Sequence, residues 1–170
     1  MSKRFTFTTA LLLSLAAAAC SSPDAPAAGT ASSSAPAAGP AVHDGRAVEI
    51  LADDKMKFSV VEIRAKAGER LSVTLVNNGT TPKFSMGHNW VLLTAAADFD
   101  AFLMAAAEAA TSDYVPASKR AEILAATKLL GPGERDTTTF AAPSVPGKYP
   151  FLCSYPGHAQ VGMRGVLIVE

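Results

Sequence analysis

Short runs with the spacing of β-strands follow one another along most of this 170-residue chain. In residues 71–75, Leu and Val alternate with Ser and Thr, which is the two-residue period of a strand with one buried and one solvated face. Turn-forming residues separate the runs, among them Gly68 and Asn78-Gly79. So many short strands predict an all-β fold, a Greek-key β-sandwich. The predicted strands are residues 47–51, 58–63, 71–75, 90–93, 137–140, 148–153 and 165–169.

Residues 94–130 depart from this pattern and are rich in Ala, Leu and Lys. Apolar residues recur at helical intervals in two groups, one around Phe102 and one from Ile123 to Leu129, with Pro116 between them. We therefore expect a helical flap of one or two amphipathic helices, inserted between strands and packed by its apolar stripe against one side of the sandwich. A helix that docks a partner is the alternative, and we favour the role of covering the core.

The N-terminus has the pattern of an export signal over residues 1–19. Lys3 and Arg4 precede an apolar run that is too short to cross a bilayer. The run ends at Cys20 in a sequence similar to a bacterial lipoprotein box, in which the Cys is acylated after cleavage. Such boxes usually carry Leu three residues before the Cys, where this chain has Ala17. Ordinary secretion is the alternative, but an unpaired Cys in an oxidising compartment favours acylation.

Residues 20–42 would join this lipid-anchor Cys to a folded domain at residues 43–170. The stretch is Ala, Pro, Ser and Gly with almost no charge, so it cannot bury enough apolar surface to fold, and we expect a disordered tether. We do not expect His43, at its end, to bind a metal. The predicted location is the periplasm, tethered to a membrane through Cys20. The outer membrane is favoured because Ser21, and not an acidic residue, follows the Cys.

Charge excludes one class of partner. The chain has 15 basic and 15 acidic residues, and loss of Lys3 and Arg4 with the signal would leave a net charge of about −2. No basic patch suggests nucleic acid.

Four residues carry the candidate chemistry. Cys153, His158 and Met163 lie in one short segment near the C-terminus, and His88 lies far upstream. A thiolate, two imidazoles and a thioether form the ligand set of a blue-copper electron-transfer site. Cys153 would be a free thiol in an exported protein, where thiols are usually oxidised or occupied, and metal ligation would protect it. The imidazoles must be neutral to bind, so metal affinity should fall in acid.

Each of these residues also has a simpler explanation. A single His in a loop is often a hydrogen-bonded structural residue, and Met163 could fill a gap in the core. Zinc competes for a Cys and two His, but structural zinc sites favour four strong ligands in closely spaced pairs. A Cys-His nucleophile pair would require an oxyanion hole, and the sequence offers no separate Gly-rich loop to build one. We favour copper because the four residues occur together.

The segment from residue 47 to residue 170 resembles the azurins of the cupredoxin family. The resemblance is strongest in three blocks, MGHNWVL at 86–92, TKLLGPGERDTTTF at 127–140 and YPFLCSYPGH at 149–158. It implies a cupredoxin-like sandwich in which Cys153 and the two His bind one type 1 copper. It also implies that the carbonyl oxygen of Gly87 approaches the copper axially and that Asn89 fixes the thiolate loop by hydrogen bonding.

One departure from azurins concerns the axial ligand. The usual spacing from the second His to the Met is four residues, whereas Gly162 occupies that position here and Met163 follows. The five-residue spacing is similar to that of plastocyanins and auracyanins, so Met163 stays the expected ligand. Gln160 is the alternative, because an amide oxygen can occupy the axial position.

The resemblance implies an electron carrier, here periplasmic or on the cell surface, that cycles one copper between Cu(I) and Cu(II). It does not imply an enzyme, since a fully ligated copper leaves no position for substrate. His158 would reach the surface in an apolar patch of Met86, Tyr155 and Pro156, where redox proteins such as cytochromes or copper enzymes dock briefly. Trp90 would fill the core beside the site. We expect a monomer. Copper storage or delivery is the alternative function, but such a protein needs an open, exchangeable site.

Overall fold

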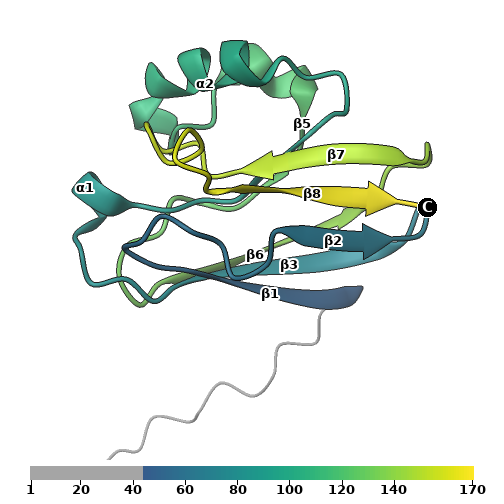
Figure 1. The fold of residues 1–170 in the computed structure, drawn as a ribbon, viewed down its shortest axis with the longest axis horizontal. Helices are drawn as coiled ribbons and strands as arrows, with labels where there is room; N and C mark the ends of the chain where they lie inside the picture. Colours follow the sequence, from purple (N-terminus) through teal and green to yellow (C-terminus); the bar gives the residue numbers. More distant parts are fainter. Residues whose placement is uncertain (1–43) are drawn as a thin grey trace, which may run out of the picture. The chain divides into compact units, whose positions relative to one another are not determined.

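A computed structural model describes residues 44–170 of the chain. Within them, eight strands form two sheets that pack face to face (Figure 1), one of strand order β1-β3-β6 and the other of order β2-β8-β7-β4-β5. β1 pairs with β3 and β2 with β8 in parallel, and the other pairs are antiparallel. The predicted β-sandwich is confirmed. The strands are β1 Arg46–Ala52, β2 Glu62–Ala65, β3 Arg70–Asn77, β4 Val91–Leu93, β5 Ile123–Ala126, β6 Arg135–Ala141, β7 Gly147–Leu152 and β8 Arg164–Val169.

The core lies between the two sheets. Alternate residues of β3, including Leu71, Val73 and Leu75, are fully buried, as the two-residue period predicts. Trp90 is fully buried as well, and its ring lies 5.5 Å from that of Phe151, centroid to centroid. Each such side chain contributes about 1.5–3 kcal/mol by leaving water. The predicted core position of Trp90 is confirmed.

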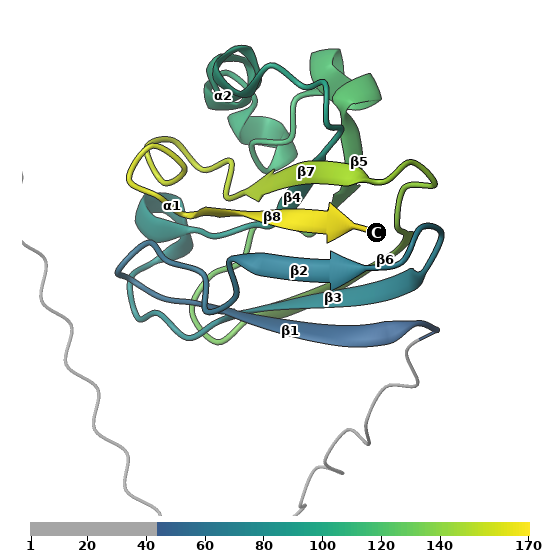
Figure 2. The same ribbon diagram turned by 45° about the vertical axis from the view of Figure 1, so that its right-hand side comes forward.

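The helical flap covers the outer face of the larger sheet (Figure 2). α2 spans Phe99–Ala107 and begins at Asp98, whose carboxylate accepts a hydrogen bond from the backbone N–H of Ala101. Phe102 and Leu103 of this helix are buried in a second apolar cluster, which includes residues of β4 and β7. Two short 3₁₀ helices follow, at Ala110–Ser112 and Ala117–Glu122. This half of the flap has the predicted role of covering the core.

The second half of the predicted flap is wrong. Ile123 to Ala126 form strand β5, not a helix, and pair with β4. The burial of Ile123 and Ala125 alternates with the exposure of Leu124, so the local period is two. Three apolar residues in a short run fit both periods, and pairing with β4 decides between them.

The predicted strand at residues 58–63 is also partly wrong, because β2 begins only at Glu62. Phe58 forms an isolated bridge with Ala52, at the end of β1, and the backbone N–H of Ser59 donates to the carbonyl of Leu51. The chain thus leaves the smaller sheet at residues 58–61 and enters the larger sheet at β2. This crossing between the sheets interrupts what the sequence presents as one apolar run.

The predictions for the signal at residues 1–19, for Cys20, for the tether at 20–42 and for His43 fall outside the described residues. In the part of the chain that is described, no helix combines the length and the apolar character needed to cross a membrane.

Candidate metal centre

The candidate residues gather at one end of the sandwich. The short helix α1, Lys83–Met86, and the loop between β7 and β8 lie at this end in both views (Figures 1 and 2). His88 follows α1, Cys153 follows β7, and His158 lies in the loop before β8. Segments about 65 residues apart in the sequence therefore meet where the strands end.

The three strongest donors converge. One ligand atom from each of His88, Cys153 and His158 lies within 4.8 Å of the other two. The Cys153 Sγ is 3.5 Å from the Nδ1 of His158, and the centroids of the two imidazole rings are 5.0 Å apart. His88 and Cys153 are completely buried, and His158 is 3% exposed. The site is thus closed to bulk water except at the edge of His158.

The hydrogen bonding of His88 tests whether a metal fits. Both ring nitrogens of His88 are buried, and neither has a hydrogen-bond partner in the described residues. Buried polar atoms are nearly always paired, and an unpaired one costs about 1–3 kcal/mol. A metal ion between His88, Cys153 and His158 would use a lone pair of this ring. Two imidazoles and one thiol are suitable donors for such an ion.

The protonation states favour binding at neutral pH. Burial lowers the pKa of His158 to about 4, and a charge on His88 acts in the same direction. Burial also lowers the pKa of His88, although the Asp54 carboxylate and the Asp53 backbone oppose the shift. Both rings are therefore neutral at pH 7 and keep a free lone pair. Burial raises the pKa of the Cys153 thiol to about 12, so a metal would displace its proton on binding.

The segment that carries His88 is fixed by its backbone. The N–H of His88 donates to the carbonyl of Leu130 at 3.1 Å, and the N–H of Leu130 donates to the carbonyl of His88 at 2.8 Å. A Cβ added to Gly87 would lie 2.7 Å from the carbonyl oxygen of Lys83 and 2.9 Å from the side chain of Leu129. Only glycine therefore allows α1 to approach this closely just before the ligand.

Asn89 links this segment to the thiolate loop. Its Oδ1 accepts from the backbone N–H of Ser154 at 2.8 Å, and its Nδ2 donates to the Ser154 hydroxyl at 2.8 Å and to the Asp113 carbonyl at 2.8 Å. Both Asn89 and Ser154 are buried. Because Ser154 is adjacent to Cys153, these bonds hold the thiol relative to His88. The contact with Asp113 also ties the flap to the site.

The loop from residue 153 to residue 163 closes on itself. The N–H of Cys153 donates to the carbonyl of Met163 at 3.0 Å, and the N–H of Met163 donates to the carbonyl of His158 at 2.9 Å. Met163 is completely buried and belongs to the same core cluster as Cys153. Gln160, the alternative axial ligand, is exposed. Its position outside the buried site argues against that role.

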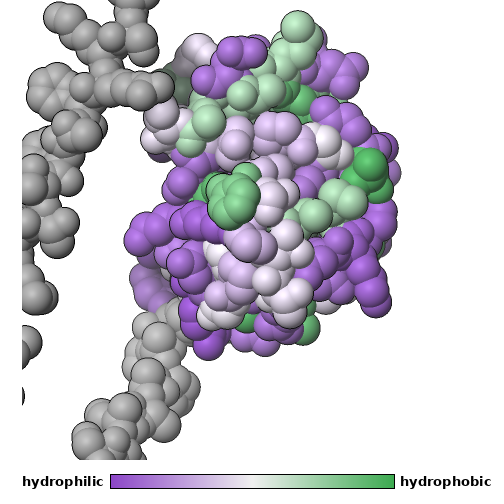
Figure 3. Space-filling view, turned by 90° about the vertical axis from the view of Figure 1, so that its left-hand side faces the viewer, coloured by the Kyte–Doolittle hydropathy of each residue, from purple (hydrophilic) through white to green (hydrophobic). Residues whose placement is uncertain are grey.

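The surface above His158 is more apolar than the sequence indicates. Tyr155 lies against the His158 ring, with 4.6 Å between centroids, and its hydroxyl donates to the Phe84 carbonyl at 2.7 Å. Phe84 itself is 84% exposed. Sequence reasoning missed Phe84, because a single aromatic among polar residues gives no periodic signal. Figure 3 looks onto this end, where apolar residues stand among pale and polar ones.

Comparison with known proteins decides the family. Residues 47–170 match the family of copper binding proteins described as the plastocyanin/azurin family. This chain belongs to that family. Because the matched segment contains all the predicted copper-binding residues and the buried donors suit the metal, copper is the cofactor that the family and the site indicate together.

Individual relatives agree with this assignment to the plastocyanin/azurin family. An azurin of Pseudomonas denitrificans is 36% identical over 127 residues, which are 73% of this chain and 98% of the azurin. Outer membrane protein H.8 of Neisseria gonorrhoeae is 36% identical over 126 residues, which are 73% of this chain and 68% of that protein.

Solved structures confirm the cupredoxin fold. Dithionite-reduced auracyanin from the photosynthetic bacterium Roseiflexus castenholzii matches with a TM-score of 0.61 and 35% identity, over 73% of this chain and 96% of that one. An auracyanin B structure matches with a TM-score of 0.64 and 32% identity, over 74% of this chain and 88% of that one. The predicted resemblance to an azurin-like cupredoxin is therefore confirmed.

Proposed function

We propose that this cupredoxin is an electron carrier that holds one type 1 copper between the side chains of His88, Cys153 and His158. The observation that carries the proposal is the convergence of these three buried donors, two of them neutral imidazoles at pH 7. Bound copper supplies a centre that gains and loses a single electron.

Met163 and Gly87 would complete the set of residues that hold the copper. Met163 is completely buried, and its carbonyl accepts from the N–H of the proposed thiolate ligand Cys153. We propose that its thioether would be the weak fourth donor to bound copper. Gly87 directly precedes His88, and its Cα packs closely against the Lys83 carbonyl and the Leu129 side chain. We propose that the carbonyl oxygen of Gly87 would be a further weak contact of bound copper.

The protein holds the three donors rigidly and keeps them away from water. The backbone bridge of His88 to Leu130 and the side-chain bonds of Asn89 hold the donors from two directions. The loop of Cys153 closes through its own backbone, so the donors need not move when the charge of the ion changes. The donors are buried and only the edge of His158 is exposed. This burial excludes water and leaves no space for a substrate. These features support electron transfer over catalysis.

A docking patch surrounds the exposed edge of His158. It consists of Phe84, Met86, Tyr155 and Pro156, with Phe84 and Pro156 exposed and the other two half-buried. None of the four is charged, so association with redox proteins such as cytochromes or copper enzymes would be brief and weakly dependent on salt. A monomer would keep this patch free for each partner in turn.

The proposed location is the periplasm, with the domain tethered to a membrane by acylated Cys20. The signal-like residues 1–19 and the tether composition of 20–42 support this location. The similarity to a protein named as an outer membrane protein also supports it. Replacing Cys20 by Ser should move the full-length protein from the membrane fraction to the soluble fraction. A wild-type protein already found in the soluble fraction would contradict the anchor.

Repeated oxidation and reduction distinguishes the carrier from a delivery protein. The protein, loaded with one equivalent of copper, is cycled between ascorbate and ferricyanide in the presence of a modest chelator. We expect the copper to stay bound over many cycles, because the donors are buried and held from both sides. Rapid loss of copper to the chelator would instead support storage or delivery.

A further inference from the structure

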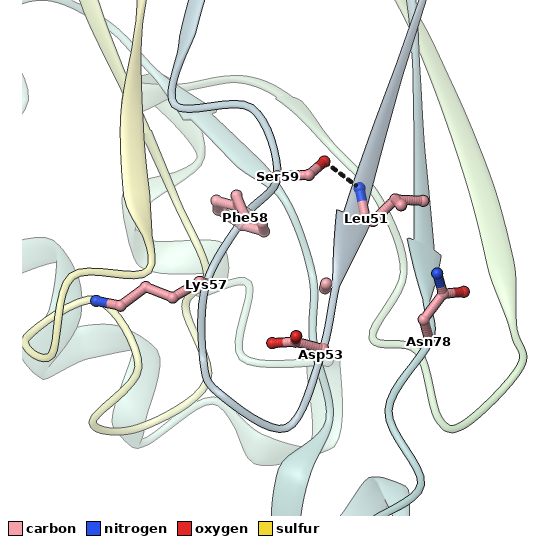
Figure 4. A pocket seen from close by; sticks show the side chains of 7 residues that line it. Leu51, Asp53, Lys57, Phe58, Ser59 and Asn78 are labelled. Carbon is pink, nitrogen blue, oxygen red and sulfur yellow. Dashed lines mark hydrogen bonds between the residues drawn. The ribbon is translucent and has the colours of Figure 1, made fainter.

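The loop between β1 and β2 runs beside the loop of residues 153–163, which we call the ligand loop. A lysine side chain of the first loop is hydrogen-bonded to the second. Lys57 and Phe58 of this loop line a pocket of about 240 Å³ together with the end of β1 and Asn78. Figure 4 shows that Phe58 points inward, whereas Lys57 extends away toward the loop that precedes β8. The Nζ of Lys57 donates to the carbonyl of Val161 at 2.6 Å. Val161 lies between His158 and Met163.

Lys57 donates to a carbonyl of the ligand loop for which the loop's own backbone provides no donor. The carbonyls of Gly157, His158 and Ala159 all accept from N–H groups within the loop, at 2.9–3.2 Å. The Val161 carbonyl has no such internal partner among the described residues, and the ammonium of Lys57 supplies one. A charge-assisted bond of this length is stronger than a neutral one.

Gly162 lies next to this bond and occupies the position at which azurins usually have the axial Met, so the ligand loop is one residue longer here. Gly162 has a φ of +98°, a conformation that favours glycine. A Cβ at this position would lie 2.7 Å from the Nζ of Lys57. The absence of a side chain at Gly162 therefore permits both the turn and the approach of the ammonium. Met163 follows directly, so the turn determines where its side chain begins.

We propose that Lys57 is a positioning residue that anchors the Val161-Gly162 turn and thereby fixes Met163 against the copper site. The proposal rests on the proposed function. The Lys57 side chain compensates for the five-residue spacing between His158 and Met163 by holding the longer turn from outside. Its positive charge, next to the loop, also favours the reduced ion, which carries one positive charge less.

Matched variants separate the anchor from the charge. Lys57→Met keeps the apolar length of the side chain and removes both the bond and the charge. Lys55→Met, two residues earlier in the same exposed loop, removes the same charge, and Lys55 has no side-chain bond to the ligand loop. Lys57→Arg keeps a cation that can reach the same carbonyl and serves as the rescue.

The first measurement uses copper-free protein and follows hydrogen exchange in residues 158–163. Loss of one anchoring bond in Lys57→Met should speed exchange in this segment by about two- to tenfold. Lys55→Met should leave the exchange unchanged, and Lys57→Arg should restore most of the protection. Equal exchange in Lys57→Met and Lys55→Met would overturn the anchor.

The second measurement uses copper-loaded protein and compares the reduction potential and the electron paramagnetic resonance spectrum. Lys57→Met should lower the potential more than Lys55→Met and should change the copper hyperfine splitting, which responds to axial ligation. Identical spectra and potentials in the two variants would overturn the role toward copper. A wild-type protein that never turns blue would overturn the proposed function instead, while the exchange measurement still decides whether Lys57 anchors the turn.

Discussion

The two segments that build the metal site are held in different ways. The upstream segment carries one donor, His88, and its backbone is paired with Leu130 like a short continuation of the sheet. The downstream loop carries Cys153, His158 and Met163, and residues 153–163 pair with no strand in the described part of the chain. It depends on internal turns and on side chains from elsewhere, among them Asn89. Backbone pairing with a neighbouring segment is thus enough to position one predicted ligand, whereas a loop that carries three predicted ligands needs several hydrogen bonds to hold it.

The two segments also differ in how close their histidines lie to the surface. His88 lies behind the site and is completely buried, while His158 meets the surface beneath Tyr155. We therefore expect the rear of the site to be structural and the front to be the side that redox partners approach. Changes at the rear should affect stability, and changes at the front should affect exchange with partners.

The largest expected effect on stability follows from removing the side chain of Asn89, which joins the two segments. Asn89→Ala removes three hydrogen bonds and leaves the N–H of Ser154 buried without a partner. We expect the free energy of unfolding of the copper-free protein to fall by about 2–4 kcal/mol. Urea denaturation measures it, with Ser154→Ala as a control that removes only one of these bonds. A loss no larger than that of the control would show that the segments are held without Asn89.

The next effect concerns the close approach before His88. Gly87→Ala would place a Cβ 2.7 Å from the carbonyl of Lys83, and the backbone there is already acceptable for alanine, so the cost is steric. We expect a loss of about 1–3 kcal/mol in thermal or urea unfolding. Gly131→Ala is the control, because its nearest neighbour is a Lys83 side-chain carbon at 3.1 Å. Equal stability of the two variants would mean that α1 can move away from the ligand segment.

An effect of comparable size should depend on pH and on His158. Its pKa is about 4 in the folded protein and about 6.5 when unfolded, so the unfolded chain binds more protons between these values. The stability of the copper-free protein should therefore fall as the pH is lowered below 6.5, by about 2 kcal/mol at pH 5 from this residue. Denaturation of the wild type and of His158→Gln at pH 7 and pH 5 measures the difference. If the variant loses as much stability as the wild type, His158 does not carry the dependence.

The smallest effect on stability, but a clear effect on exchange, is expected at the front. Phe84→Lys places a charge in the docking patch without touching the buried donors, because Phe84 is 84% exposed. The absorption spectrum should stay unchanged, while electron exchange with a redox partner slows. Met104→Lys on α2 is the control, since Met104 is 74% exposed on the flap. Slower exchange only in the Met104 variant would assign docking to the flap.

Much of the fold could be predicted from the sequence because its strands alternate clearly. β3 is the best example, with Leu71, Val73 and Leu75 buried in the two-residue period. β5 could not be predicted, because its apolar residues fit a helix as well as a strand. Only pairing with β4, which is a long-range contact, selects the strand.

The donors of the site could be predicted because cysteine and histidine are rare in this chain. His88, Cys153 and His158 converge in the structure, which supports the predicted ligand set, and the matching family confirms copper as the cofactor. The supports could not be predicted in the same way. The roles proposed for Lys57 and Phe84 depend on their positions in the fold, and neither has a neighbour in sequence that indicates a role.

The most direct test of the central claim is the visible spectrum of the copper-loaded protein beside its Cys153→Ser variant. If Cys153 gives a thiolate ligand to a copper held by His88 and His158, the oxidised wild type is intensely blue and the variant has lost that colour. A wild type that remains colourless with cupric ion, or a variant that keeps the same band, would contradict the account.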